Sequence, residues 1–323
     1  MKGTLWLAWR QQRALVLTAL AALTACAVWV ALRRADMTAF IDAHHIPVCK
    51  GWDPEECSTD AVTVALAQRL IEDNTGAIRL LGAFSAALPV LIGLFWGAPL
   101  IGREIETGTV KLALSQGAGL RQWFTARLGL AALCAVVAST TLAALVAWWW
   151  APVSNMLDGL YWHDGFLFNA TGPAAVACAL FGLAASTAAG ALLRRTTPAM
   201  GAALAAVAGT RLLLTFVRPD WLEPLRRVTP GAAPKKYVGS AWSTGEFGYL
   251  DAAGREFPIS RYCQLSGAEM RQCMTEHGFV ARYHKVYPSG DFWTLQWIET
   301  AIFLGLAAAL LVATYAVLRR RVV

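Results

Sequence analysis

The stretch Gly102–Arg127, GREIETGTVKLALSQGAGLRQWFTAR, is charged and punctuated by glycine, and it separates two long apolar runs. These runs, residues 77–101 and 128–150, are each long enough to cross a bilayer core of roughly 30 Å as a helix. A charged stretch cannot stay in hydrocarbon, because its polar groups would find no partner there. We therefore expect it to lie at a membrane surface and to face a partner there.

The composition of the whole chain also indicates a membrane protein. It has 323 residues, of which 57% are hydrophobic and 15% charged. We predict an all-α polytopic membrane protein with six transmembrane helices. The predicted spans are residues 14–32, 77–101, 128–150, 173–193, 199–217 and the last segment, 292–323, which ends in a basic tail. The first 218 residues also include an amphipathic interfacial helix over residues 1–13, and a polar extracellular insert over residues 219–291 lies between helices five and six.

The charge distribution gives an orientation. Six spans put both termini on one side, where twelve basic residues are opposed only by Glu104 and Glu106. By the positive-inside rule, both termini and the Gly102–Arg127 stretch are cytoplasmic in a multi-pass protein of the plasma membrane. Arg33 and Arg34 are exceptions to this rule. The net charge of +7 therefore reflects orientation, and we expect no nucleic-acid partner.

Seven cysteines divide between two environments. Those within apolar runs are Cys26, Cys134 and Cys178, and those in polar segments on the external side are Cys49, Cys57, Cys263 and Cys273. Disulfides persist outside the cell. Of the three possible pairings, we favour Cys49–Cys57 with Cys263–Cys273, because each closes a short loop. Cross-linking between the two loops is the alternative.

Two charges lie within apolar runs. Arg211 is about 20 Å from the inner end of the fifth span, and Glu299 is about 9 Å below the outer end of the last span, at 1.5 Å per residue. Both positions fall in the outer third of the bilayer core. An isolated charge there is costly, so we expect an Arg211–Glu299 pair or a shared polar cavity. The alternative is that each side chain reaches the outer interface separately.

Small residues recur every four positions in two spans, a pattern that lets helix backbones approach closely. We expect these faces to contact other helices, although a sequence rich in Ala and Gly also produces such patterns by chance. The residues are Gly182, Ser186 and Gly190 in the fourth span and Gly201, Ala205 and Gly209 in the fifth.

The sequence lacks the motifs of several enzyme classes. No Gly-x-x-x-x-Gly-Lys-[Ser/Thr] segment occurs, so we expect this chain not to hydrolyse ATP itself and to hold no catalytic residue. No His-Glu-x-x-His helix occurs, and the five histidines are scattered except for the adjacent His44 and His45. Because a metal site needs three or four converging ligands, we expect none.

The charged stretch resembles the loop between the second and third spans of type-2 ABC exporter permeases. The matching residues are Gly102-Arg103-Glu104-x-Glu106-Thr107-Gly108-Thr109, then Gln116, then Leu120-Arg121-x-Trp123. The segment Phe292-Trp293-x-x-Gln296-Trp297-Ile298-Glu299 resembles the beginning of the last span in actinobacterial permeases. The large insert departs from compact members of the family.

The resemblance implies a function. In such proteins six spans form one subunit, two subunits form a homodimer or related heterodimer, and the loop is a coupling helix that docks on a cytosolic ATP-binding subunit. ATP and Mg²⁺ would then be bound by that partner. Export of hydrophobic or amphipathic compounds follows on family grounds. The alternatives are a membrane sensor or scaffold with an extracellular ligand-binding domain and, less well supported by the scattered histidines, a membrane-embedded enzyme.

The chemistry of the stretch agrees with a coupling role. Thr109 can cap a helix over residues 110–116, and Gly117–Gly119 then ends it. A helix of two turns is unstable alone and needs a partner surface. Leu112 and Leu114 would enter a groove on the partner while Lys111 reaches its rim. Glu104 and Glu106 would pair with Arg103, Arg121 or basic groups of the ATPase; a solvated loop is the alternative. The expected coupling residues are Gly102, Arg103, Glu104, Glu106, Thr107, Gly108, Thr109, Lys111, Leu112, Gln116 and Arg121.

Overall fold

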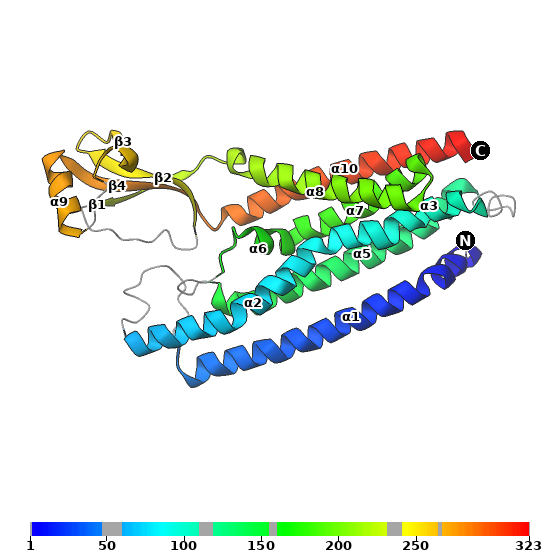
Figure 1. Cartoon of the computed structure of the whole chain (residues 1–323), viewed down its shortest axis with the longest axis horizontal. Helices are drawn as coiled ribbons and strands as arrows, with labels where there is room; N and C mark the ends of the chain where they lie inside the picture. The colour runs from blue at the N-terminus through cyan, green and yellow to red at the C-terminus, as the bar shows by residue number, and fades with distance from the viewer. Residues whose placement is uncertain are drawn as a thin grey trace.

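The protein is a bundle of long helices with a small α/β insert at one end (Figure 1). This computed structural model describes residues 2–46, 60–109, 119–154, 160–230, 241–263 and 267–322. The helices of the bundle are α1 (Lys2–Ala43), α2 (Ala61–Ile92), α3 (Ala98–Glu106), α5 (Leu120–Trp150), α6 (Gly165–Ala170), α7 (Gly172–Leu193), α8 (Thr196–Val217) and α10 (Asp291–Val322). Within the described residues, six helical stretches are long and apolar enough to cross a membrane, as predicted. Both chain termini lie at the end of the bundle opposite the insert.

The first two membrane spans are parts of much longer helices. Helix α1 has 42 residues, or about 63 Å at 1.5 Å per residue, roughly twice the thickness of the bilayer core. It continues past the apolar run because Met37 and Ile41 join Leu70 and Ile71 of α2 in one buried apolar cluster. The residues expected as an interfacial helix are helical from Lys2 onward and continue into the first span as one helix, α1.

Helix α2 is continuous with α3 through one π-helical turn, Gly93–Gly97. Pro89 has no backbone N–H, and the N–H of Gly93 bonds to the carbonyl oxygens of Pro89 and Val90. The chain is thus helical from Ala61 to Glu106, with a widened turn just after Pro89.

Helix α7 lies at the centre of the bundle, and most of its side chains are buried (Figure 1). A helix that is apolar on all sides suits such a position. A Cβ atom on Gly182 would lie 2.3 Å from the carbonyl oxygen of Pro89, and one on Gly190 would lie 3.0 Å from the backbone nitrogen of Gly102. The predicted contact face of the fourth span is therefore confirmed.

The corresponding face of the fifth span has no partner among the described residues. Gly201, Ala205 and Gly209 on α8 are exposed, and no described atom outside the local helix lies within 4 Å of a Cβ built on either glycine. The prediction that this face packs on another helix is wrong for the single subunit.

The insert contains a sheet that the sequence analysis did not predict. Strands β1 (Leu225–Pro230), β2 (Trp242–Asp251), β3 (Glu256–Pro258) and β4 (Phe279–Tyr287) form an antiparallel sheet in the order β1-β4-β2-β3. Helix α9 (Gly267–Glu276) lies against it, with Met270 and Met274 in a cluster with Tyr249 and Phe279.

The disulfide Cys263–Cys273 links α9 to the segment before it, in the predicted pairing. Cys26, Cys134 and Cys178 are free, as expected for cysteines of apolar runs. The predicted Cys49–Cys57 pair lies outside the described residues.

Candidate functional site

The charged stretch begins as the last turn of α3, at the end of the bundle that carries both termini (Figure 1). The helix ends at Glu106, and Gly108 follows with φ of +72°, a conformation that favours glycine. The Thr109 hydroxyl donates to the Glu104 carboxylate at 2.9 Å. In the described part of the stretch, Thr109 thus holds the turn back against α3.

Glu104 fixes the stretch to the third membrane span. Its carboxylate lies 2.9 Å from a guanidinium nitrogen of Arg127 on α5, and the two side chains are 18% and 8% exposed. Arg127 also donates to the Gln11 side chain of α1 and lies over the Trp123 ring, 5.1 Å from its centre. The pairing of Glu104 with Arg103 or Arg121 was predicted wrongly, because Arg127 lies on the buried face of α5 and can reach the carboxylate.

Glu106 fixes the stretch to the fifth span. Its carboxylate accepts hydrogen bonds from the backbone N–H of Thr196 at 3.3 Å and from the Thr196 hydroxyl at 3.0 Å. Thr196 is the first residue of α8, so the negative charge lies where the helix dipole favours it. The expected pairing of Glu106 with a basic residue of this chain is therefore also wrong.

The rest of the predicted coupling set is placed only in part. Arg103 and Arg121 are exposed and form no ion pair within the described residues. Lys111, Leu112 and Gln116, with the predicted helix over residues 110–116, lie outside the described residues.

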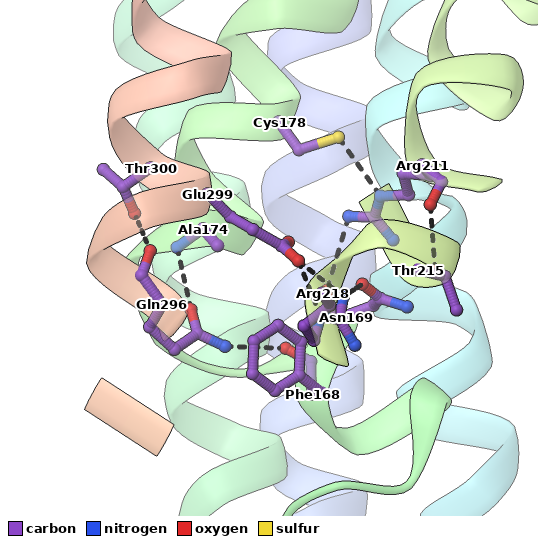
Figure 2. A network of polar contacts seen from close by, with 10 residues as sticks. All are labelled: Phe168, Asn169, Ala174, Cys178, Arg211, Thr215, Arg218, Gln296, Glu299 and Thr300. Atoms are coloured by element: carbon purple, nitrogen blue, oxygen red, sulfur yellow. Dashed lines mark hydrogen bonds and ion pairs between the residues drawn. The ribbon is translucent and has the colours of Figure 1, made fainter. Parts of the chain in front are cut away.

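A second polar cluster is buried near the insert (Figure 2). Arg218, which follows α8, donates to a carboxylate oxygen of Glu299 on α10, with nitrogen–oxygen distances of 2.6 and 2.8 Å. The Arg218 and Glu299 side chains are 6% and 3% exposed. The guanidinium also lies over the Phe168 ring, 3.7 Å from its centre. A pair this deeply buried holds the end of α8 against α10.

The predicted Arg211–Glu299 ion pair is wrong. Arg211 instead donates to the carbonyl oxygen of Ala86 at 3.0 Å, to that of Asn169 at 3.4 Å and to the Cys178 sulfur at 3.2 Å (Figure 2). Arg218 takes the carboxylate because it lies two helical turns beyond Arg211 and so extends from the same face.

Arg211 and Arg218 nevertheless belong to one polar network. This agrees with the second expectation, that Arg211 and Glu299 share a polar environment. Asn169 joins the two arginines, since its side-chain oxygen accepts from Arg218 at 3.4 Å and its backbone oxygen accepts from Arg211. Sequence reasoning missed Arg218 and Asn169. The signal for Arg218 was its seven-residue spacing from Arg211, but the predicted fifth span ended at residue 217, one residue before it.

Gln296 stabilises the break between α6 and α7. Its side-chain nitrogen donates to the carbonyl oxygen of Phe168 at 2.8 Å, and its oxygen accepts from the N–H of Ala174 at 3.0 Å. Gly172, with φ of +71°, leaves room for this amide, because a Cβ there would lie 2.5 Å from its oxygen. The amide therefore satisfies backbone groups that the helix ends leave unpaired.

Aromatic rings connect the insert to the bundle. His163, in the loop before α6, stacks on Tyr161 and on Trp242 of β2, with ring centres 5.4 and 6.2 Å apart. Burial lowers the pKa of His163, partly offset by Asp164. The Tyr287 hydroxyl of β4 donates to the carbonyl oxygen of Pro219 at 2.5 Å. The sheet is thus attached beside the buried arginine network.

Comparison with known proteins gives a family. A family model described as "ABC-2 membrane transporter related" matches residues 20–218, more than half of the chain. No curated protein and no solved structure matches it.

Proposed function

Because the chain belongs to the ABC-2 membrane transporter related family and is a permease subunit of an ABC transporter, we propose that it exports hydrophobic or amphipathic compounds. A separate subunit would bind ATP and Mg²⁺ and supply the energy. A second permease copy, identical or related, would complete the pathway.

The attachment of the Gly102–Thr109 segment to the bundle supports this proposal. Glu104 binds α5 and Glu106 binds the first residue of α8, so one short segment is held to two further spans besides its own helix. A displacement imposed on this segment by a partner would be passed to α3, α5 and α8 together. Such rigid-body movement of helices is a common means of switching a pathway.

The orientation and the role of the insert are part of the same proposal. We assign both termini and the Gly102–Thr109 segment to the cytosolic side, because the basic residues gather there. The sheet and α9 would then lie outside the cell, where the Cys263–Cys273 disulfide is stable. The insert would cover the external mouth of the pathway or recognise what leaves it.

The test is ATP turnover and dye efflux by the permease reconstituted with the ATP-binding subunit. Glu106→Ala removes the contact with Thr196, and Gly108→Pro prevents the positive φ of the turn. We expect each variant to lower transport about tenfold or more, the equivalent of losing roughly 1.4 kcal/mol of coupling free energy. Glu72→Ala is the matched control, since Glu72 is an exposed carboxylate of α2 at the other end of the bundle.

Intact transport and intact substrate-stimulated ATP turnover in both variants would refute the coupling role. Failure of the chain to copurify with any ATP-binding subunit would refute the proposed energy source.

A further inference from the structure

A hollow of about 400 Å³ opens between α1, the π-helical turn, α3 and α5, at the end of the bundle that carries the termini. This volume lies within the range of small-ligand sites in proteins. Its walls are of two kinds: the exposed Phe95 ring and the side chains of Leu15 and Leu100 are apolar, whereas Gln12 and Arg103 are polar.

The acceptors of the polar wall are already bound to protein donors. The Gln12 side-chain oxygen accepts from the Trp96 indole N–H at 2.8 Å, and the Gln11 oxygen accepts from Arg127. The Glu104 carboxylate is held by Arg127 and by the Thr109 hydroxyl. A ligand that donates hydrogen bonds would therefore have to compete with protein donors for the oxygens of Gln11, Gln12 and Glu104.

Apart from the Trp96 indole and the Arg127 guanidinium, the donors of the same wall have no partner within the described residues. Indole and guanidinium groups can only donate hydrogen bonds. The Trp96 indole and the Arg127 guanidinium therefore bind the amide oxygens of Gln12 and Gln11, and the two amide NH₂ groups remain available to a ligand. Within the described residues neither NH₂ group has a partner, and the Arg103 guanidinium has none either. Arg103 and Arg127 against Glu104 also leave one excess positive charge. The hollow thus offers donors and positive charge to whatever enters.

From this donor excess beside an apolar wall, we propose that the hollow binds the phosphate group of an anionic membrane phospholipid, with the acyl chains along Phe95 and Leu15. Phosphate supplies only acceptors and a negative charge, which match Arg103 and the two amides. The acyl chains match the apolar wall of Phe95 and Leu15, and Leu17 and Leu20, which follow Leu15 on α1, are also exposed. Trp6 and Trp9 are exposed near the beginning of α1, as is typical of residues at the headgroup level.

The proposal does not depend on coupling to an ATPase, because its readout is lipid bound to this chain alone. The experiment is native mass spectrometry of the full chain released from detergent, titrated with phosphatidylglycerol, with phosphatidylcholine or with inorganic phosphate. We expect phosphatidylglycerol to bind at least tenfold more tightly than phosphatidylcholine, and inorganic phosphate not to compete with it.

Two variants test the donors directly. Arg103→Gln removes the free charge, and Gln12→Glu keeps the acceptor for Trp96 while turning the NH₂ donor into a carboxylate oxygen. Each should weaken phosphatidylglycerol binding about tenfold or more, as expected for loss of a hydrogen bond to a charged group. Arg13→Gln is the matched control, since Arg13 is an exposed cation of α1 that does not line the hollow. It should bind lipid like the unaltered chain.

Three results would overturn the proposal. Equal weakening by Arg103→Gln and Arg13→Gln would show that surface charge alone attracts the lipid. Equal binding of the two lipids would show that the headgroup charge is not read. Displacement of phosphatidylglycerol by inorganic phosphate would make the occupant a free anion. If Gln12→Glu does not yield folded protein, Arg103→Gln decides the matter, because Arg103 is exposed and needs no buried partner.

Discussion

Removing one member of the Arg218–Glu299 pair should destabilise the protein far more than removing both. Glu299→Leu leaves Arg218 and Arg211 in the same buried network without a carboxylate, and Arg218→Met leaves Glu299 as an unpaired buried charge. Breaking a buried pair from one side costs about 3–5 kcal/mol, whereas replacing both partners by apolar residues is often nearly neutral. We expect each single variant to lose about 3–5 kcal/mol and the double variant clearly less than either.

The assay is the free energy of unfolding in mixed micelles, measured by titration with a denaturing detergent. Glu246→Gln provides the matched control, because Glu246 pairs with Lys285 at 2.8 Å but is 64% exposed. Loss of that surface pair should cost no more than about 1 kcal/mol. A double variant that loses as much as the sum of the two single variants would show that the two groups do not interact, and the reasoning would fail.

Three further predictions concern packing, the disulfide and pH. Gly182→Ala should disrupt the contact with Pro89 and lower the unfolding temperature, whereas Gly201→Ala, with open space around it, should be neutral or stabilising by up to about 1 kcal/mol. Cys273→Ser should destabilise the insert by about 2–4 kcal/mol, measured as faster proteolysis between β3 and β4, while the bundle stays resistant. Because burial lowers the pKa of His163, the unfolded state takes up its proton first, so stability should fall as the pH decreases below about 6.5. His163→Phe should make that decrease shallower in thermal unfolding measured from pH 7.5 to 5, and an unchanged slope would contradict it.

The number of membrane spans could be predicted from the sequence because each requires about twenty apolar residues in a row. The ends of the helices could not. Helices α1 and α2 continue outside the apolar runs through pairs such as Met37 and Leu70, whose mutual burial depends on tertiary contacts. The sheet of the insert was also missed, because its strands lie within a segment assigned only as polar.

The candidate sites show a similar division. Residue types indicated that Glu104, Glu106 and Glu299 need partners, since a carboxylate at or within a membrane needs compensation. The partners were Arg127, Thr196 and Arg218, and each comes from another helix. Their identity depends on how the helices are rotated against one another, which the spacing of residues along a single helix does not determine.

The unbroken helical path from Ala61 to Glu106 has a mechanical consequence. Its 46 residues give a helical path of about 69 Å, so a tilt at one end is passed to the other to the extent that the path stays stiff. A tilt of about 5° of the whole path would swing the tip far from Glu106 sideways by roughly 6 Å. The contacts of that tip with α1, such as that of Leu70 with Met37, would have to shift with it. The widened turn at Gly93–Gly97 is the point where this helical path would bend. Its stiffness therefore determines how much of a displacement at Glu106 reaches the other end, at Ala61.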